Sequence, residues 1–563
     1  MNYPGGRTNR IASGAGGEAE SASSGPSSMI SILMPVYNTP PDILDEAIRS
    51  VLLQTYSFWE LCICDDCSTV ANTSDVLMEY WGTDPRIKIV RTPKNMHIAG
   101  ATNYVAQYAA GDFVAFLDHD DALRPDALAK VAEAIARFPN ADVFYTDEDK
   151  LEEDGSHTEP YLKPAWSPEH LRSVMYILHF FTLRKSLFLE LGGLREEYSG
   201  AQDYDLALRA TNGREVVHVP GVLYHWRKIP GSAAAEVDAK PEALVRAEAA
   251  LRDFAYSIDR NAMITGGLHP GTFRVMWHVD PTRPVTLLLT TNGGVREVEG
   301  RGKLRLLDNA VRSIVEKSSF RNFKLLVVDN GNLDSAAQNL VNDANGRVVS
   351  FSSKERFNFA EKMNFAVSHV DTEDVILLND DIEVISEGWI EALLGFSRQA
   401  DIGAVGARLL YPNGRVQHQG VVLGVCGLTS HIFHNMRDED VGYNVFTHIV
   451  RNYSAVTGAV LATRLGLLRQ LGGFDANLRV DYNDIDYCLR LGQLGLRIVY
   501  TPFAKLYHFE GSSLARKFVD PADEAVFLER WRSIIDRDPF FNPFLARDRL
   551  DCSPTVQAYN RPA

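Results

Sequence analysis

Cysteine is scarce in this sequence. The 563 residues include only six cysteines, too few for a disulfide framework to hold a chain of this length together. Three of them cluster at Cys62, Cys64 and Cys67, but a metal site there would need a fourth ligand and a looser loop than this strand-like run. We therefore interpret them as small buried apolar residues and expect a reducing compartment.

Long apolar segments are also missing. No run of residues approaches the length that a bilayer-spanning helix needs. Residues 1–28 are rich in glycine, serine and alanine and lack the apolar core of a signal peptide, so they are predicted to form a disordered tail. These features predict a soluble, cytoplasmic protein.

Basic charge is in deficit. The chain carries 57 lysines and arginines against 73 acidic residues, a formal net charge of −16. This balance argues against a nucleic-acid partner, which would require a basic surface, and disfavours strong electrostatic docking on an anionic membrane. An acidic protein can still hold anionic phosphates through a bound divalent cation. The length itself exceeds what one hydrophobic core supports, so at least two domains are expected.

Short apolar runs alternate with helical stripes along the first part of the chain. The runs that begin at Ile30, Trp59 and Phe113 each stop abruptly at turn-forming or acidic residues. This alternation predicts an α/β fold with a mainly parallel sheet and helices on both faces. Ligands bind beyond the carboxyl ends of the strands in such sheets. The clusters Asp65-Asp66 and Asp118-His-Asp-Asp follow strands in that position.

The same order of features restarts near Val285, which indicates an internal duplication. Acidic clusters after strands, a Leu-Gly-Gly, an acidic helix start and a Tyr-His all recur at matching intervals. The predicted organisation is a disordered tail (1–28), a first domain (29–230), a helical connector (231–283), a second domain (284–515) and a C-terminal helix and strap lying on the second domain (516–563).

Several of these residues suit metal-assisted transfer chemistry. Asp118 and Asp120, one residue apart at a strand end, offer hard oxygen ligands for Mg²⁺ or Mn²⁺, although an isolated pair of this kind is more often a turn. Asp203 and Asp484 each open a helix, so each is either a helix cap or a general base. A histidine follows each of them; a lone histidine is usually structural, but recurrence beside the acidic motifs in both copies favours a metal ligand.

Two ordered sets of short motifs recur in the chain. They are Met34-Pro-Val-Tyr-Asn, Cys64-Asp-Asp-Cys-Ser, Asn95, Asn103, Leu117-Asp-His-Asp-Asp, Gln202-Asp-Tyr-Asp and Tyr224-His-Trp-Arg in the first half, and Val328-Asp-Asn-Gly, Asn358-Phe-Ala-Glu, Asn364, Leu378-Asn-Asp-Asp, Asn483-Asp-Ile-Asp and Tyr507-His-Phe-Glu in the second. With these motifs each half resembles a family 2 glycosyltransferase with the GT-A fold. Together the halves are similar to the tandem enzymes of bacterial surface-polysaccharide or O-antigen biosynthesis.

The resemblance implies a role for each of these positions. Asp203 and Asp484 would act as bases for inverting transfer from a nucleotide-diphosphate sugar to a glycan hydroxyl. A lipid-linked glycan is one acceptor that the resemblance allows, and it would bring the protein to the inner face of the membrane as a peripheral protein. The implied nucleotide-sugar contacts are Pro35, Tyr37, Asp65, Asp66, Asn95, Asn103, Asp118, Asp329, Asn364 and Asp380. The implied ligands of Mn²⁺ or Mg²⁺ are Asp118, Asp120, His225, Asp381 and His508.

The second half departs from the family pattern. It lacks the proline near the end of its first strand, carries a charged insertion from Arg296 to Lys303, and has an amide, Asn379, in place of the first metal-binding carboxylate. It is therefore either a second transferase or a weakened copy retained for acceptor binding. Two rival functions fit less well. A nucleotidyltransferase usually has a basic phosphate loop, which is missing here, and a silent scaffold would be expected to lose Asp203 and Asp484.

Overall fold

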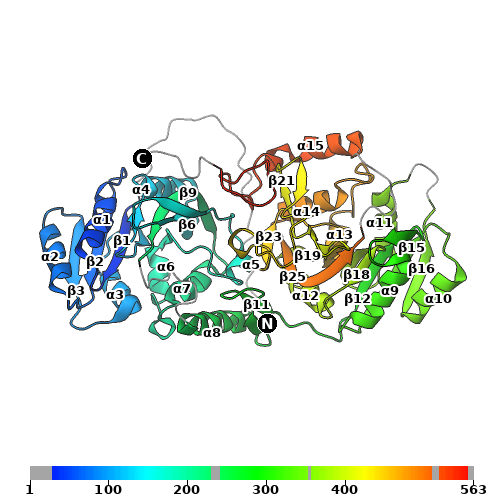
Figure 1. Cartoon of the computed structure of the whole chain (residues 1–563), viewed down its shortest axis with the longest axis horizontal. Helices are drawn as coiled ribbons and strands as arrows, with labels where there is room; N and C mark the ends of the chain where they lie inside the picture. The colour runs from blue at the N-terminus through cyan, green and yellow to red at the C-terminus, as the bar shows by residue number, and fades with distance from the viewer. Residues whose placement is uncertain (1–27, 230–240, 353–356, 510–518, 556–563) are drawn as a thin grey trace.

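A computed structural model describes residues 28–229, 241–352, 357–509 and 519–555. It shows two α/β domains side by side, the first coloured blue to green and the second green to orange (Figure 1). Each domain is built on one large mixed sheet with helices on both faces. The predicted pair of tandem α/β domains is confirmed.

The first sheet is parallel on one side and mixed on the other. β1, β2, β3 and β4 are mutually parallel neighbours, as the alternating pattern predicts, but β8 runs antiparallel to β4 and makes the sheet mixed. In the order in which they lie across the sheet, the strands are β3 (Ile87–Arg91), β2 (Trp59–Asp65), β1 (Ile30–Val36), β4 (Phe113–Phe116), β8 (Thr182–Arg184), β6 (Val143–Leu151), β9 (Val216–Arg227) and β5 (Ala122–Leu123), with β7 (His157–Tyr161) paired to β6.

Helices cover both faces of this sheet because each has one apolar side. In α1 the predicted stripe is buried, with Leu44, Ala47, Ile48 and Val51 fully enclosed. α1 and α4 pack on one face, and α3, α6 and α7 pack on the other. The helices are α1 (Pro41–Leu52), α2 (Ala71–Tyr80), α3 (His97–Ala106), α4 (Ala127–Arg137), α5 (Pro168–Leu171), α6 (Lys185–Glu190) and α7 (Gln202–Thr211).

The second domain repeats this arrangement in space as well as in sequence. Its strands cross the sheet in the order β16 (Gly346–Ser350), β15 (Phe323–Asp329), β12 (Val285–Thr290), β17 (Asp374–Asn379), β24 (Val460–Arg464), β19 (Ile402–Leu410), β25 (Arg497–His508) and β18 (Ile382–Val384), with β20 (Val416–His418) and β23 (Arg451–Tyr453) at the side. Its helices are α9 (Leu306–Lys317), α10 (Ser335–Asp343), α11 (Phe359–Ser368), α12 (Trp389–Ser397), α13 (Leu465–Gln470) and α14 (Asn483–Gln493). The matching strand order agrees with an internal duplication.

Several segments lie outside the two sheets, and one of them contacts both domains. The connector contains α8 (Pro241–Ile258), which packs on α7, and a hairpin of β10 (Met263–Gly266) and β11 (Phe273–Met276). The charged insertion forms a second hairpin, β13 (Val295–Val298) with β14 (Gly302–Arg305), and β21 (Val421–Leu423) pairs with β22 (Thr429–His431). After α15 (Pro521–Ile535) on the second domain, the strap also reaches the first domain, where the Asn542 amide donates to Asp147 Oδ2 at 2.9 Å.

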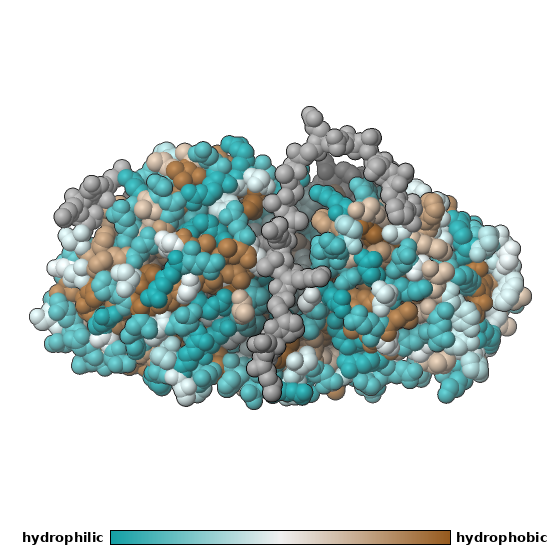
Figure 2. All heavy atoms as spheres, turned by 180° about the vertical axis from the view of Figure 1, so that it is seen from behind, coloured by the Kyte–Doolittle hydropathy of each residue, from teal (hydrophilic) through white to brown (hydrophobic). Residues whose placement is uncertain are grey.

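The visible surface is mainly polar. Hydrophilic side chains cover most of the face shown in Figure 2, and hydrophobic atoms appear there in several separate groups. Among the helices that the structure describes, none is long and apolar enough to cross a membrane.

A buried ion pair joins the two domains. Glu169, at the start of α5, lies 2.8 Å from Arg497 on β25 of the second domain, and its side chain is fully buried. Arg172 lies 3.1 Å from the same carboxylate. Burial alone would raise the pKa of Glu169, but the two guanidinium groups lower it to about 2. The carboxylate therefore remains charged inside the interface.

Removing that carboxylate should destabilise the protein strongly. In Glu169→Gln, two arginines lose their buried counter-charge, and we expect the free energy of unfolding to fall by about 3–5 kcal/mol in urea titrations. The wild-type contribution should be lost as the pH falls from about 4.3, the pKa of an unfolded glutamate, towards 2. Glu133→Gln breaks an exposed pair with Lys130 and should cost under about 1 kcal/mol. Equal losses in the two variants would contradict this account of the interface.

Candidate active site

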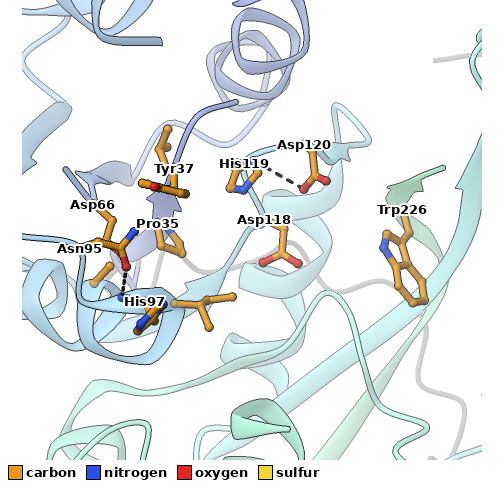
Figure 3. A pocket seen from close by; sticks show the side chains of 12 residues that line it. Pro35, Tyr37, Asp66, Asn95, His97, Asp118, His119, Asp120 and Trp226 are labelled. Carbon is orange, nitrogen blue, oxygen red and sulfur yellow. Dashed lines mark hydrogen bonds and ion pairs between the residues drawn. The ribbon is translucent and has the colours of Figure 1, made fainter. Parts of the chain in front are cut away.

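A cavity of about 580 Å³ opens at the carboxyl ends of β1, β2 and β4, where ligands bind in sheets of this kind (Figure 3). It is large enough for a small-molecule ligand. Six of the residues predicted to bind nucleotide sugar or metal line it: Pro35, Tyr37, Asp66, Asn95, Asp118 and Asp120. Its other lining residues are Val36, His97, Ile98, Ala101, His119 and Trp226.

One end of the cavity is bordered by Asp66, which follows Asp65, the last residue of β2. Asp66 lines the cavity, and its carboxylate accepts hydrogen bonds from the backbone N–H of Met96 at 2.7 Å and from the Thr92 hydroxyl at 3.0 Å. Asp65 turns aside, where it lies 2.7 Å from Arg91 and accepts from the Ser68 N–H. The neighbouring aspartates thus differ in position: Asp66 faces the cavity and Asp65 braces the loop that follows.

Carboxylates gather at the other end. Ligand atoms of Asp118, Asp121 and His179 lie within 4.8 Å of one another, and Asp120 is beside them in the cavity wall. Desolvation raises the pKa of Asp118, with the charges of Asp120 and Asp203 adding to the effect and His179 opposing it. Desolvation raises the pKa of Asp121 further. Crowded carboxylates of this kind bind a divalent cation readily, because the cation removes their mutual repulsion.

Sequence reasoning missed His179, which lies in the loop before β8. Its ring stacks on Tyr224 with 4.4 Å between centroids and meets Trp226 edge to face at 5.3 Å. The buried Glu148 lies 3.3 Å from its Nδ1. Burial lowers the pKa of His179, but Glu148, Asp118 and Asp121 together raise it. Nothing in the spacing of the motifs marks this residue, because only the folded sheet brings its loop to the acidic cluster.

Asp203 lies at the edge of the same cluster. It is exposed in the first turn of α7, and its negative charge contributes to the raised pKa of Asp118. Desolvation raises the pKa of Asp203 as well. A carboxylate with increased proton affinity beside a ligand cavity has the property that a general base requires.

The equivalent region of the second domain is organised differently. His508 on β25 lies 3.0 Å from Asp381 through Nε2, while its Nδ1 lies 2.6 Å from Gln417. Asp380 accepts a hydrogen bond from the hydroxyl of Thr291, and burial raises its pKa to about 6. The structure therefore brings the predicted residues Asp380, Asp381 and His508 together at the strand ends.

The other two acidic residues predicted to be functional in this domain, Asp329 and Asp484, accept hydrogen bonds from backbone N–H groups of the same domain. Asp329 accepts hydrogen bonds from the backbone N–H groups of Asn332 and Leu333. Asp484 accepts from the N–H of Gly458 at 2.7 Å and of Ile485 at 2.9 Å, although burial raises its pKa as it does for Asp203.

Both halves match sequence profiles of one family. The profile of Glycosyl transferase family 2 matches residues 31–192, and that of Glycosyltransferase like family 2 matches residues 300–519. The chain belongs to glycosyltransferase family 2. Its two domains are family 2 glycosyltransferase domains in tandem, as the repeated motifs predict.

Curated relatives match most of this chain, across both of its domains. "Uncharacterized protein y4gI" of Sinorhizobium fredii is 37% identical over 538 residues, which are 93% of this chain and 58% of the relative. "O-antigen biosynthesis protein RfbC" of Myxococcus xanthus is 33% identical over 535 residues, 93% of this chain and 41% of the relative. The chain thus spans about half the length of these relatives. The solved structure of S. aureus TarS 1–349 in complex with UDP matches 41% of this chain and 73% of that one, at 19% identity and a TM-score of 0.32.

Two residues predicted to contact the nucleotide sugar in this family 2 glycosyltransferase, Asn103 and Asn364, form hydrogen bonds with backbone groups instead. The Asn103 side chain donates to the carbonyl of Leu194 at 2.7 Å and accepts from its N–H at 2.9 Å. Asn364 forms the same pair with Phe474, both at 2.8 Å. In each domain this asparagine fixes the loop after the Leu-Gly-Gly motif, which explains its recurrence by folding alone.

His225 is also placed away from the predicted metal ligands. Tyr224 and Trp226 point to the cavity side of β9, since the Tyr224 hydroxyl bonds Asp121 and Trp226 lines the cavity. Successive strand residues face opposite ways, so His225 points to the other face. There its Nδ1 lies 2.7 Å from Asp149, next to His157. The structure thus brings His179, and not His225, to Asp118.

Proposed function

We propose that this chain transfers a sugar from a nucleotide-diphosphate sugar to a hydroxyl of a growing cell-surface glycan, with inversion at the anomeric carbon. One observation carries the proposal: the charge of Asp203 acts on Asp118, which forms a metal-type cluster with Asp121 and His179 and lines the same cavity as Asp120 and Asp66. A donor that spans the cavity would place its nucleoside at Asp66 and its diphosphate at the carboxylates.

The residues present fit a divalent metal ion. Asp118 and Asp121 have raised pKa values because their negative charges are desolvated and close together, which a bound cation would relieve. Asp118 and Asp120 would hold Mn²⁺ or Mg²⁺ through hard oxygen ligands, with Asp121 and His179 beside them. When bound, the ion supplies charge neutralisation for the departing diphosphate.

The protein's own groups account for the rest of the proposed reaction. Asp203 removes the proton of the acceptor hydroxyl while the oxygen of that hydroxyl bonds to the anomeric carbon. The bond between this carbon and the diphosphate breaks on the opposite side. Trp226 forms a flat apolar wall on the cavity, and the Lys150 ammonium lies 3.0 Å from its ring centroid. A flat aromatic wall suits the apolar face of a sugar ring.

The relatives support a cell-surface glycan as acceptor. One is called an O-antigen biosynthesis protein, and "UDP-Glc:alpha-D-GlcNAc-diphosphoundecaprenol beta-1,3-glucosyltransferase WfgD" of Escherichia coli is 45% identical over 93 residues, 16% of this chain and 35% of that protein. We propose that the acceptor is a lipid-linked glycan, which would bring the protein to the membrane surface. A less favoured function, in which both domains transfer sugar, would need a second open donor cleft.

The proposal is tested with a panel of nucleotide sugars and Mn²⁺, measuring release of the nucleoside diphosphate with and without oligosaccharide acceptors. We expect release from one donor class, strongly stimulated by acceptor, and NMR of the product should show the anomeric configuration inverted. Asp66→Ala should raise KM for the donor about tenfold or more, because a hydrogen-bonding wall group is lost. Retention of configuration would contradict the assigned role of Asp203.

A further inference from the structure

The two paired asparagines align the domains residue by residue at the donor cleft. Asn103 in α3 and Asn364 in α11 occupy the same place, because each makes the same two hydrogen bonds to the backbone after a Leu-Gly-Gly turn. Two residues earlier on each helix, the first domain has Ala101 and the second has Lys362. Ala101 lines the cavity of the first domain.

Lys362 extends its side chain into the corresponding region of the second domain. Its Nζ donates to the carbonyl of Thr291 at 2.7 Å and to Oδ1 of Asn330 at 3.0 Å. Only 3% of the residue is exposed. The side chain is therefore enclosed, and two of its three N–H bonds are satisfied by the protein itself.

The two partners of Lys362 correspond to walls of the first cavity. Thr291 is equivalent to Val36. Val36 is the last residue of β1 and lies beside the end of β2, and Thr291 directly follows β12 and lies beside the end of β15. Asn330 follows β15 as Asp66 follows β2. Val36 and Asp66 both line the first cavity. In the second domain the ammonium group thus occupies the gap between the equivalent walls.

The charges agree with this placement. Asp329 and Asp380 both act on Lys362, so a buried cation already lies among the carboxylates of the second domain, although desolvation still lowers the pKa of its ammonium to about 8. The amide of Asn379 removes another negative charge where the first domain has Asp118. The second cleft therefore holds a lysine ammonium among its carboxylates, where the first cleft has the uncharged Ala101.

We infer that the Lys362 side chain fills the donor cleft of the second domain, so that a metal–nucleotide complex binds the first domain alone. This inference rests on the proposed function, because it assumes that the first cavity is the donor site. It predicts that one substitution opens the second cleft: Lys362→Ala would give that domain the residue that the first domain already has at Ala101.

Titration calorimetry with UDP, GDP, CDP and dTDP, each with Mn²⁺, counts the sites. The wild-type chain should bind one nucleotide of its preferred type, and Lys362→Ala should bind two, because the vacated cleft regains walls like those of the first. Glu361→Ala, on an exposed neighbour in the same helix, is the matched control and should bind one. Two sites in the wild type, or one in a folded Lys362→Ala variant, would overturn the inference.

The reciprocal variant keeps the test decisive if Lys362→Ala fails to fold. Ala101→Lys introduces the same side chain into the first cleft and should abolish nucleotide binding while circular dichroism shows a folded protein; persistent binding would refute the inference. Failure of the proposed function has a different signature. In that case the wild type binds no nucleotide at all, whatever the behaviour of the Lys362→Ala variant.

Discussion

Asp203→Asn should lower kcat for sugar transfer by about 10²–10⁴-fold while donor binding remains. The amide has the shape of the carboxylate but cannot take the proton of the acceptor hydroxyl, and a positioned general base contributes a factor of this size. Nucleotide release in the presence of acceptor measures kcat, and calorimetric titration with the nucleoside diphosphate measures binding. Asp484→Asn is the matched control at the same position of the second domain, and it should keep turnover within about twofold.

The folded state should not suffer from this substitution. Desolvation raises the pKa of Asp203 above its ordinary value of 3.8, so the native protein holds its proton more tightly than the unfolded chain does. The residue is nevertheless exposed in the first turn of α7, so the shift carries little folding free energy, and the amide leaves no buried group without a partner. We expect Asp203→Asn to resist urea at least as well as the wild type. A large loss of stability would show that the lost activity reflects misfolding.

The pH profile follows from the same shift. The base must be ionised to act, so kcat should fall as the pH decreases through the raised pKa of Asp203, at a pH above 3.8. The acid limb should disappear from the residual activity of Asp203→Asn. An unchanged acid limb in that variant would assign the ionisation to another group.

The parallel half of each sheet could be predicted from the sequence because its signals are local. Each signal is contained in a short segment, such as the apolar run at Ile30 or the acidic cluster at Asp118. The topology of parallel strands then places the acidic clusters at one edge of the sheet. The mixed half of each sheet could not be predicted in the same way. Its strands are joined by long connections, and the antiparallel direction of β8 has no local signature.

For the same reason, the sequence pattern could not predict the position of residues whose role depends on partners far away in the chain. His179 reaches the acidic cluster only because β8 lies next to β4. His225 is displaced from it because alternation along β9 turns Tyr224 and Trp226, rather than His225, towards the cavity. A motif fixes where a side chain lies along a strand, and the neighbouring strands decide which face it uses.

The second domain shows why a recurring residue need not retain its chemistry. Asp484 stays in place, but its carboxylate accepts hydrogen bonds from the backbone of Gly458 and Ile485, so it has a structural reason to persist. The Asn364 amide has one too. The Lys362 side chain, by contrast, reaches Thr291 and Asn330 at the strand ends of this domain. Folding constraints therefore explain the repeated motif set in the second half, while the first half adds the open cavity that transfer requires.

Removal of the metal, or of its main ligand Asp118, should abolish activity, because we expect the metal to act only in the first domain. With EDTA, or in Asp118→Asn, the diphosphate would leave without charge neutralisation, a change of several kcal/mol that corresponds to a loss on the order of 10³-fold in kcat. Added Mn²⁺ should restore the EDTA-treated wild type but not the variant, and Mn²⁺ titration followed by electron paramagnetic resonance should show weaker binding in Asp118→Asn. In the second domain the position of Asp118 is already the amide Asn379, so the comparison variant is Asp381→Asn, which removes a neighbouring carboxylate that lies near His508. It should leave both turnover and tight Mn²⁺ binding within about twofold of the wild type. Full activity in EDTA would refute a metal-dependent mechanism, and equal losses in the two variants would show that both domains take part in transfer.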